Sequence, residues 1–143
     1  MEDRFLFRGK RIDNGEWVEG FYFCMTHPDG RHTHHFIIPL GADLSLGTPV
    51  EKIQVEVDPD TICQCTGLKD SNGKLIWEND VCDRKEEYPE IVKYNKGDWT
   101  LDYSYSKDRE SGYCYCNLGF YVLERKCVEV IGNVFDNPEL LEV

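Results

Sequence analysis

The sequence predicts a mainly β protein, with an N-terminal β-hairpin subdomain over residues 1–60, a small β-barrel or roll over residues 61–143 and a short C-terminal helical turn. Two observations support this fold class. Short apolar stretches with a period of two alternate with turns rich in Gly, Pro and Asn, which is typical of all-β barrels and rolls. No segment repeats apolar residues at i, i+3, i+4 and i+7 over three turns, so no long amphipathic helix is expected.

The first element is a β-hairpin at the N-terminus. Phe5 and Phe7 lie two positions apart, which places them on one face of a short strand. Asn14 and Gly15 follow, and Asn-Gly supplies the positive φ angles of a tight turn. The aromatic and β-branched stretch 17–23 then predicts the returning strand.

A second turn and two further strands are expected before residue 60. Residues 28–30, Pro-Asp-Gly, predict the turn, and the pair Ile37 and Ile38 marks the next strand. Residues 41–50 have little periodicity and predict a loop. Residues 52–57 alternate strictly between polar and apolar types, which is the period of a half-buried strand.

The C-terminal half predicts more short strands around a hairpin turn at Asn72 and Gly73. Residues 118–126 are the best helical candidate, but their aromatic content favours a strand, and residues 106–112 predict a mobile polar loop. Asn137 and Pro138 predict a helical turn with a capping Asn and Pro in first position. The expected strands are residues 62–66, 74–77, 80–83, 90–94, 98–105, 113–123 and 128–134.

The charge of the chain restricts its partners. The formal net charge is -11 with a sequence pI near 4.7, and Arg8, Lys10 and Arg11 form its one basic cluster. A negative mean field repels phosphate backbones, so nucleic acid is the less expected partner. The N-terminus lacks the apolar core of a signal peptide, and no run approaches the roughly 18 apolar residues of a membrane span. The sequence therefore predicts a cytoplasmic protein with no membrane partner.

The cysteines present the most suggestive local pattern. Cys63 and Cys65 form one Cys-x-Cys pair, Cys114 and Cys116 form another, and four thiolates are a ligand set for structural zinc. Zinc sites usually space their cysteines by two to four residues in a turn, and Cys is also a common buried residue. The chain has seven cysteines, an odd number, without an export signal. Reduced thiols are favoured over a metal site or a disulfide, and no cofactor is predicted.

Two other clusters raise the possibility of catalysis. His27, His32, His34 and His35 lie close to Cys24, a candidate nucleophile with an imidazole base. The Pro-Asp-Gly turn beside them favours a solvated hairpin tip, and no third catalytic group is identifiable.

Carboxylates form the second cluster. Glu56, Asp58 and Asp60 alternate, and Glu124 with Lys126 forms a Glu-x-Lys pair of the kind found in magnesium-dependent nucleases. Because the chain has 27 acidic residues, chance pairs are expected. Phosphate loops, nucleophile elbows and zinc-protease motifs are missing from the sequence, and the prediction is that the protein is not an enzyme.

The chain resembles the YopX family of bacteriophage and prophage proteins. The similar blocks are FRGKRIDNGEWVEGFYF at 7–23, FIIP at 36–39, VDPDTICQCTGLKDSNGKLIWENDV at 57–81 and CVEVIGNVFDNPELLE at 127–142. The resemblance implies a phage or prophage origin in a bacterial host and an SH3-type small barrel in the C-terminal part. It implies no established biochemical activity.

Two departures from the family pattern concern backbone and cysteine positions. The family has Glu-Gly-Asp where this chain has Asn79 as the central residue, and Gln-Tyr-Thr-Gly where it has Cys65 in second place. Asparagine tolerates positive φ, so Asn79 is predicted in the left-handed region. Cys65 is outside the family pattern, which weakens the metal hypothesis. Structural turns are predicted at Asn14, Gly15, Asn72, Gly73, Asn79 and Gly132.

The favoured function is a non-enzymatic phage or prophage accessory protein that binds another macromolecule, with protein as the partner and homo-oligomerisation as a variant of this role. Trp17, Trp77 and Trp99 are the candidate anchors, although a β-core position is favoured for at least two of them. The first alternative is nucleic-acid association through Arg8, Arg11 and their neighbours Lys10 and Trp17. The second alternative is a metal-dependent enzyme.

Overall fold

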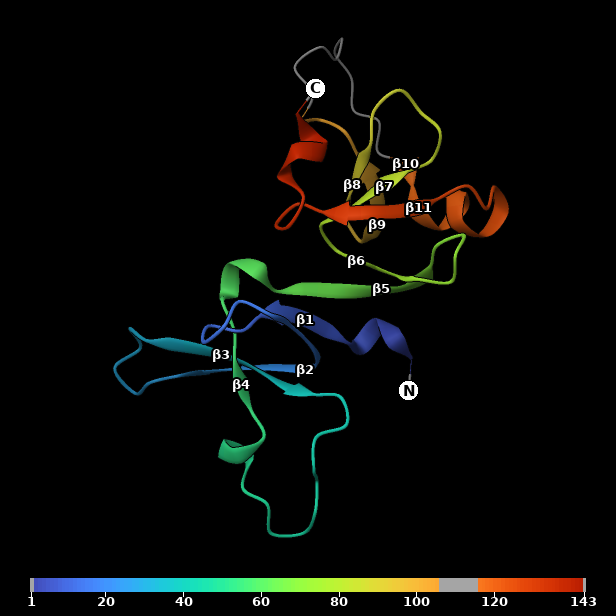
Figure 1. Ribbon diagram of the computed structural model, residues 1–143. Coiled ribbons are helices and arrows are strands. Elements are labelled where there is room, and N and C mark those ends of the chain that lie inside the picture. Colours follow the sequence, from blue (N-terminus) through green and yellow to red (C-terminus); the bar gives the residue numbers. More distant parts are fainter. Residues whose placement is uncertain (1, 106–115, 143) are drawn as a thin grey trace. The chain divides into compact units, whose positions relative to one another are not determined.

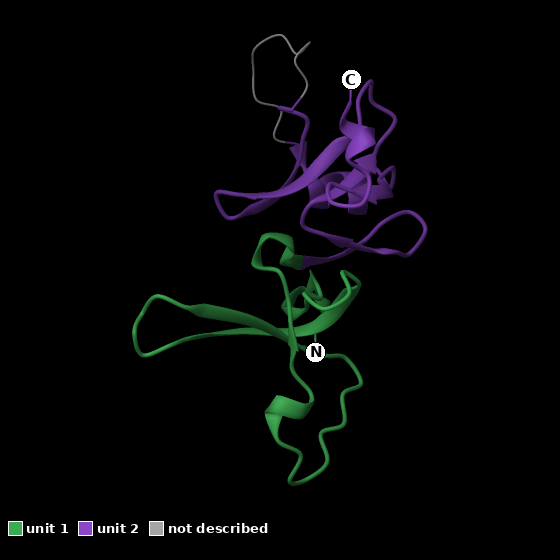
Figure 2. Ribbon diagram, turned by 60° about the vertical axis from the view of Figure 1, so that its left-hand side comes forward, with its two compact units in different colours: residues 1–64 green, residues 65–143 purple. Residues whose placement is uncertain are grey.

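The computed structural model describes residues 2–105 and 116–142 and divides into two compact units, residues 1–64 and 65–143 (Figures 1 and 2). Both are built from antiparallel strands, so the mainly β prediction is confirmed. One strand, β5 (Cys63–Lys69), crosses the division, which lies between Gln64 and Cys65 rather than at the predicted residue 60. The predicted polar loop at 106–112 lies outside the described residues.

The first unit is a meander of antiparallel strands in the order β4-β3-β2-β1-β5. Asn14 and Gly15 connect the first two strands as predicted, and Gly15 has φ 74°. The Pro-Asp-Gly turn connects β2 to β3, whose register pairs Gly20 with Pro39 and Thr26 with Thr33. The elements of this unit are η1 (Asp3–Phe5), β1 (Phe7–Lys10), β2 (Trp17–Thr26), β3 (Thr33–Pro39), η2 (Val50–Lys52), β4 (Val55–Glu56) and η3 (Pro59–Thr61).

The chain following β4 returns along the end of β1 and encloses the core of the first unit. Val57 forms a bridge with Arg11, and the Asp58 amide donates to the Lys10 carbonyl at 2.8 Å. The enclosed cluster consists of Val18, Ile37 and Val57, all less than one-tenth exposed. One face of the β2–β3 hairpin therefore faces this core and the other faces outward.

The second unit carries a five-stranded sheet in the order β10-β9-β8-β7-β11. Its core consists of six buried side chains: Ile76, Cys82, Val92, Leu101, Leu118 and Val128. Beside β5, its elements are β6 (Leu75–Trp77), β7 (Asp80–Asp83), β8 (Glu90–Asn95), β9 (Asp98–Asp102), β10 (Cys116–Asn117), η4 (Phe120–Glu124), β11 (Glu129–Asn133) and η5 (Pro138–Leu141).

The predicted C-terminal barrel is corrected to an open sheet. Within the described residues the strand order begins at β10 and ends at β11 without closing, and β5 pairs with β6 in the other sheet. The correction concerns closure, not strand content, because six of the seven strands expected in this half lie at or near predicted positions. Of the seventh, predicted at 113–123, residues 113–115 lie outside the described residues and only β10 is a strand in the remainder.

Several local predictions also change. Residues 120–124 form a π-type helical turn, so the strand predicted there is wrong. Phe5 belongs to a 3-10 helix rather than the first strand, and β4 is only two residues long. Gly132 lies within β11 at a bulge, not in a turn. Asn137 precedes η5, as predicted, but its side chain accepts from the Asn133 amide at 3.2 Å instead of capping the helix.

No helix in the described part of the chain is long and apolar enough to cross a bilayer.

Candidate interaction surface

The β2–β3 hairpin carries apolar side chains on both of its faces. Alternate residues of a strand point to opposite faces, and directly paired residues share one. Tyr22 and its partner Ile37 belong to the inner face, where they pack in the core. The apolar side chains that point to the opposite face form what we call the outer apolar face. They are Phe21, Phe23, Met25, Phe36 and Ile38.

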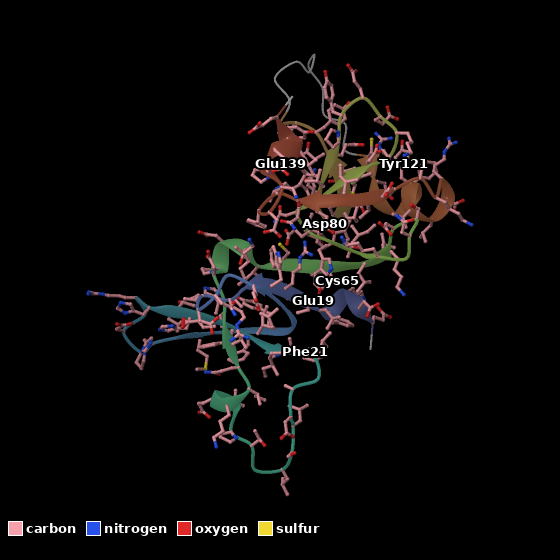
Figure 3. All side chains as sticks on the ribbon, in the orientation of Figure 1. Glu19, Phe21, Cys65, Asp80, Tyr121 and Glu139 are labelled. Atoms are coloured by element: carbon pink, nitrogen blue, oxygen red, sulfur yellow. The ribbon has the colours of Figure 1, made fainter. Side chains whose placement is uncertain are left out.

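Side-chain contacts across the hairpin hold the outer apolar face together. The Phe23 and Phe36 rings stack with centroids 5.3 Å apart and planes inclined by 25°. Phe21, labelled on β2 in Figure 3, pairs with Ile38 in the strand register. Phe21 is 38% exposed and Met25 is 56% exposed. Large apolar groups are thus presented to solvent on a rigid two-stranded support.

A pocket of about 540 Å³ lies where the outer apolar face meets the hairpin tip. Its apolar walls include Met25 and Phe36, and its polar groups include His27, His34 and Glu56. His34 Nδ1 lies 3.0 Å from Glu56 Oε2, and the His34 ring stacks on Phe36 at 6.2 Å. Three of the four histidines predicted as a cluster, His27, His32 and His34, are brought together here; we call them the tip histidines.

The fourth histidine points to the inner face with Cys24. His35 is paired with Cys24 in the strand register, but its Nδ1 contacts the Tyr22 hydroxyl at 2.6 Å. Burial raises the pKa of Tyr22, and the hydrogen bond and the charge interaction with Cys24 add to this increase. The His35 imidazole, which is paired with Cys24 in the register, is therefore hydrogen-bonded to the Tyr22 hydroxyl. This arrangement does not support the predicted pair of a Cys24 nucleophile and a histidine base.

The basic cluster is largely engaged within the first unit. The Arg8 guanidinium lies 4.6 Å from the Trp17 ring centroid and Lys10 Nζ lies 5.3 Å from it. Arg8 is only 8% exposed. Arg11 forms two hydrogen bonds of 2.9 Å to the Asp13 carboxylate, which hold the pKa of Asp13 below its usual value. These cations are oriented by an indole and a carboxylate, which reduces their availability to phosphate.

The cysteine quartet is not assembled in the described residues. Cys63 and Cys65 are fully buried, and their thiols face the carbonyl oxygens of Thr61 at 3.2 Å and Ile76 at 3.9 Å. Cys116 accepts a hydrogen bond from Arg84 Nη2 at 3.1 Å. Cys114 lies outside the described residues. Nowhere in residues 2–105 and 116–142 do three or more His, Cys, Asp or Glu side chains already have metal-binding geometry.

The remaining predicted groups are dispersed. Trp77 is buried at 3% exposure, so it is not a surface anchor, whereas Trp99 packs against the core of the second unit and contacts Tyr94 at 5.1 Å.

The predicted carboxylates do not converge, because Asp58 accepts the Asp60 amide at 3.0 Å while Glu56 contacts His34. Glu124 and Lys126 lie at the end of η4 and beyond it.

Sequence reasoning missed the outer apolar face as a candidate site. The signal was present, because Phe21, Tyr22 and Phe23 are consecutive aromatics and the partner strand has the run Phe36, Ile37 and Ile38. A strand with apolar residues at consecutive positions presents apolar side chains on both of its faces. The turn between the strands then fixes which residues pair.

Comparison with known proteins identifies the family. The model of the family described as YopX protein matches residues 6–142. The chain belongs to the YopX family. Its YopX fold is similar to a crystal structure of protein EF1440 from Enterococcus faecalis, with 26% sequence identity, a TM-score of 0.53, and coverage of 94% of this chain and 96% of that chain. No curated protein matches this YopX chain.

Proposed function

We propose that this YopX protein is a non-enzymatic accessory protein of a phage or prophage that binds a partner protein through the outer apolar face. The single observation behind this proposal is the cross-strand cluster on β2 and β3, in which the half-buried Phe23 and Phe36 stack and Phe21 and Met25 are exposed. Folded proteins rarely leave large apolar patches in water, and those they do leave commonly mark interaction sites.

The physical gain comes from removing these side chains from water. Fully burying a Phe or Met side chain contributes about 1.5–3 kcal/mol relative to leaving it exposed. Phe21 and Met25 keep 38% and 56% of their surface exposed, so a corresponding fraction of this gain remains available to a partner. Aromatic residues on a rigid strand also lose little conformational entropy on binding, which suits them to be interface anchors.

Electrostatics favours protein over nucleic acid as the partner. The chain carries a net charge of -11, and Arg11 is committed to Asp13. The outer apolar face itself has no basic residue among its five members. Protein interfaces combine an apolar centre with a polar rim, and Glu19 and Glu56 provide acidic groups next to this face.

A site-specific cross-linking experiment tests the proposal. A photoreactive benzoylphenylalanine replaces Phe21 in one variant and Leu46 in a matched control, since Leu46 is a fully exposed apolar residue of the loop at 41–50. Both proteins are expressed in the bacterial host and irradiated. We expect a discrete protein adduct from position 21 that disappears when Met25→Lys is added, and no discrete adduct from position 46.

Other outcomes lead to different conclusions. The same adducts from positions 21 and 46, or an adduct from position 21 that survives Met25→Lys, would contradict a role for the outer apolar face. An adduct with twice the mass of the chain would replace the separate partner with a second copy of this protein.

A further inference from the structure

The tip histidines share one face of the β2–β3 hairpin. His27 donates its backbone amide to the His32 carbonyl at 2.8 Å, so the two residues are opposite each other across the hairpin. His34 follows two positions after His32, and residues two apart on a strand project from the same side. Figure 2 shows this hairpin end projecting from the rest of the first unit. Three imidazoles therefore lie on one side of an accessible hairpin tip.

We propose that His27, His32 and His34 bind a divalent transition metal of the zinc class. Two imidazoles on one tetrahedral zinc, with Zn–N bonds of about 2.0–2.1 Å, have ring centroids about 5 Å apart. The His27 and His34 centroids are 5.1 Å apart, and those of His27 and His32 are 6.0 Å apart. The ring spacing is therefore already close to what a shared ion requires.

Two of these rings, His32 and His34, each have a carboxylate beside Nδ1. This contact favours the neutral tautomer with its lone pair at Nε2, which can bind a metal. His34 Nδ1 lies 3.0 Å from Glu56 Oε2, and His32 Nδ1 lies 3.0 Å from Asp29 Oδ2. When Nδ1–H donates to a carboxylate, the lone pair of the neutral ring is at Nε2, which is the metal-binding arrangement found in carboxylate–histidine–zinc sites.

The bound geometry requires small side-chain movements. No three donors among the described residues are already placed for a metal, so the rings must rotate to bring their Nε2 atoms together. His32 and His34 have side chains that are 70% and 44% exposed, which leaves room for this rotation. Three imidazoles leave the fourth tetrahedral position to water or to a partner group.

The test is zinc titration of the reduced, tag-free full chain by calorimetry at neutral pH. Cys24→Ser is used as the background, since Cys24 is an exposed thiol on the same hairpin. We expect a 1:1 site whose affinity falls at least roughly tenfold in His27→Ala and in His34→Ala, the loss that even a supporting group causes. Glu56→Gln is expected to weaken the site by about tenfold, as removal of a supporting carboxylate does.

His35→Ala is the matched control, because His35 is on the same strand but on the inner face, bonded to Tyr22. Its zinc affinity is expected to be unchanged. Cobalt substitution adds a spectroscopic readout, in which imidazole-only ligation gives no thiolate-to-cobalt charge-transfer band.

Three results would overturn the metal site. The first is that zinc binds no more tightly than it does to the His27→Ala/His32→Ala/His34→Ala variant. The second is that His35→Ala loses as much zinc affinity as His34→Ala. The third is a thiolate-to-cobalt band in the cobalt spectrum. Circular dichroism confirms that each variant is folded. The metal site and the proposed protein-binding role are independent, because the cross-linking at position 21 requires no metal.

Discussion

Asn79 reverses the chain between β6 and β7 in a backbone conformation that few side chains adopt. Its φ is 68°, which is the left-handed value predicted from the sequence. The Asn79 amide donates to the Val92 carbonyl at 2.9 Å, and its carbonyl accepts from the Val134 amide at 3.0 Å. The turn therefore ties together three segments of the second unit, and the recognisable stretch around it reflects a backbone requirement.

Substitutions at Asn79 are expected to separate backbone strain from side-chain contact. Asn79→Gly and Asn79→Val both remove the hydrogen bond of 3.0 Å from Lys93 Nζ. Only valine has a β-branched side chain that opposes positive φ, so Asn79→Val is expected to be less stable than Asn79→Gly by about 1–2 kcal/mol. Urea unfolding of both variants measures the difference. Equal stability would show that the left-handed conformation is not maintained.

Two glycines show what single-residue rules could not predict. A Cβ on Gly20 would lie 1.9 Å from the Ile38 carbonyl oxygen, and one on Gly132 would lie 2.5 Å from Asn137 Oδ1. Neither has positive φ, so a turn is not the reason for glycine at either position. The reason is a close approach by another part of the chain, the neighbouring strand β3 for Gly20 and the segment after β11 for Gly132, which is known only from the fold.

At the scale of elements, most strands could be predicted and the exceptions have physical causes. The strand β7 has the predicted bounds, Asp80–Asp83, because the apolar pair Val81 and Cys82 lies between the turn at Asn79 and the charged stretch that follows. The strand predicted up to residue 123 is wrong from Leu118 onward. Leu118 enters the core, and Asn117 Oδ1 accepts the Phe120 amide at 2.8 Å, which begins a helical turn. Tertiary packing and one side-chain bond thus outweighed the aromatic content that favoured a strand.

Asp70 connects the turn preceding β6 to β11. It is 7% exposed; one carboxylate oxygen accepts the Asn72 and Lys74 amides at 2.9 Å and the other accepts the Val130 amide at 2.9 Å. Burial alone would raise the pKa of Asp70, but these backbone donors outweigh it, and the pKa is lowered. The ionised carboxylate therefore stabilises the folded state.

The pH dependence of stability follows from this lowered pKa. The contribution of Asp70 is complete above the pKa of an unfolded aspartate, about 3.9, and is lost as the pH falls through the lower folded value. Asp70→Asn replaces one acceptor oxygen by a donor and is expected to cost about 1–3 kcal/mol at pH 7. The cost shrinks at an acidic pH below the lowered folded pKa, where the wild-type carboxyl is protonated.

Urea unfolding at both pH values measures this effect. Asp60→Asn is the control, since Asp60 is exposed in η3, and it is expected to leave stability unchanged. An Asp70→Asn deficit that is the same at both pH values would contradict the role of ionisation.

At the scale of the whole molecule, the sequence indicated the family and the strand content but not the candidate site. Family blocks at both ends of the chain were sufficient for recognition, and the family match spans residues 6–142. The outer apolar face requires the register of β2 against β3, which places Phe23 opposite Phe36. Sheet closure also depends on long-range pairing, so the predicted barrel could not be distinguished from an open sheet by local patterns.

The net charge of -11 makes a prediction about the nucleic-acid alternative. Fluorescence anisotropy with labelled single-stranded DNA, RNA and duplex DNA is measured at about 0.01 M salt, where the Debye length is about 30 Å and electrostatic attraction is weakly screened. We expect no binding, because the mean field repels phosphates and Arg11 is paired with Asp13. Asp13→Asn, which weakens that pair, is also expected not to bind. Binding by the wild type that weakens with salt and tightens in Asp13→Asn would instead assign the Arg8, Lys10 and Arg11 cluster to phosphate recognition.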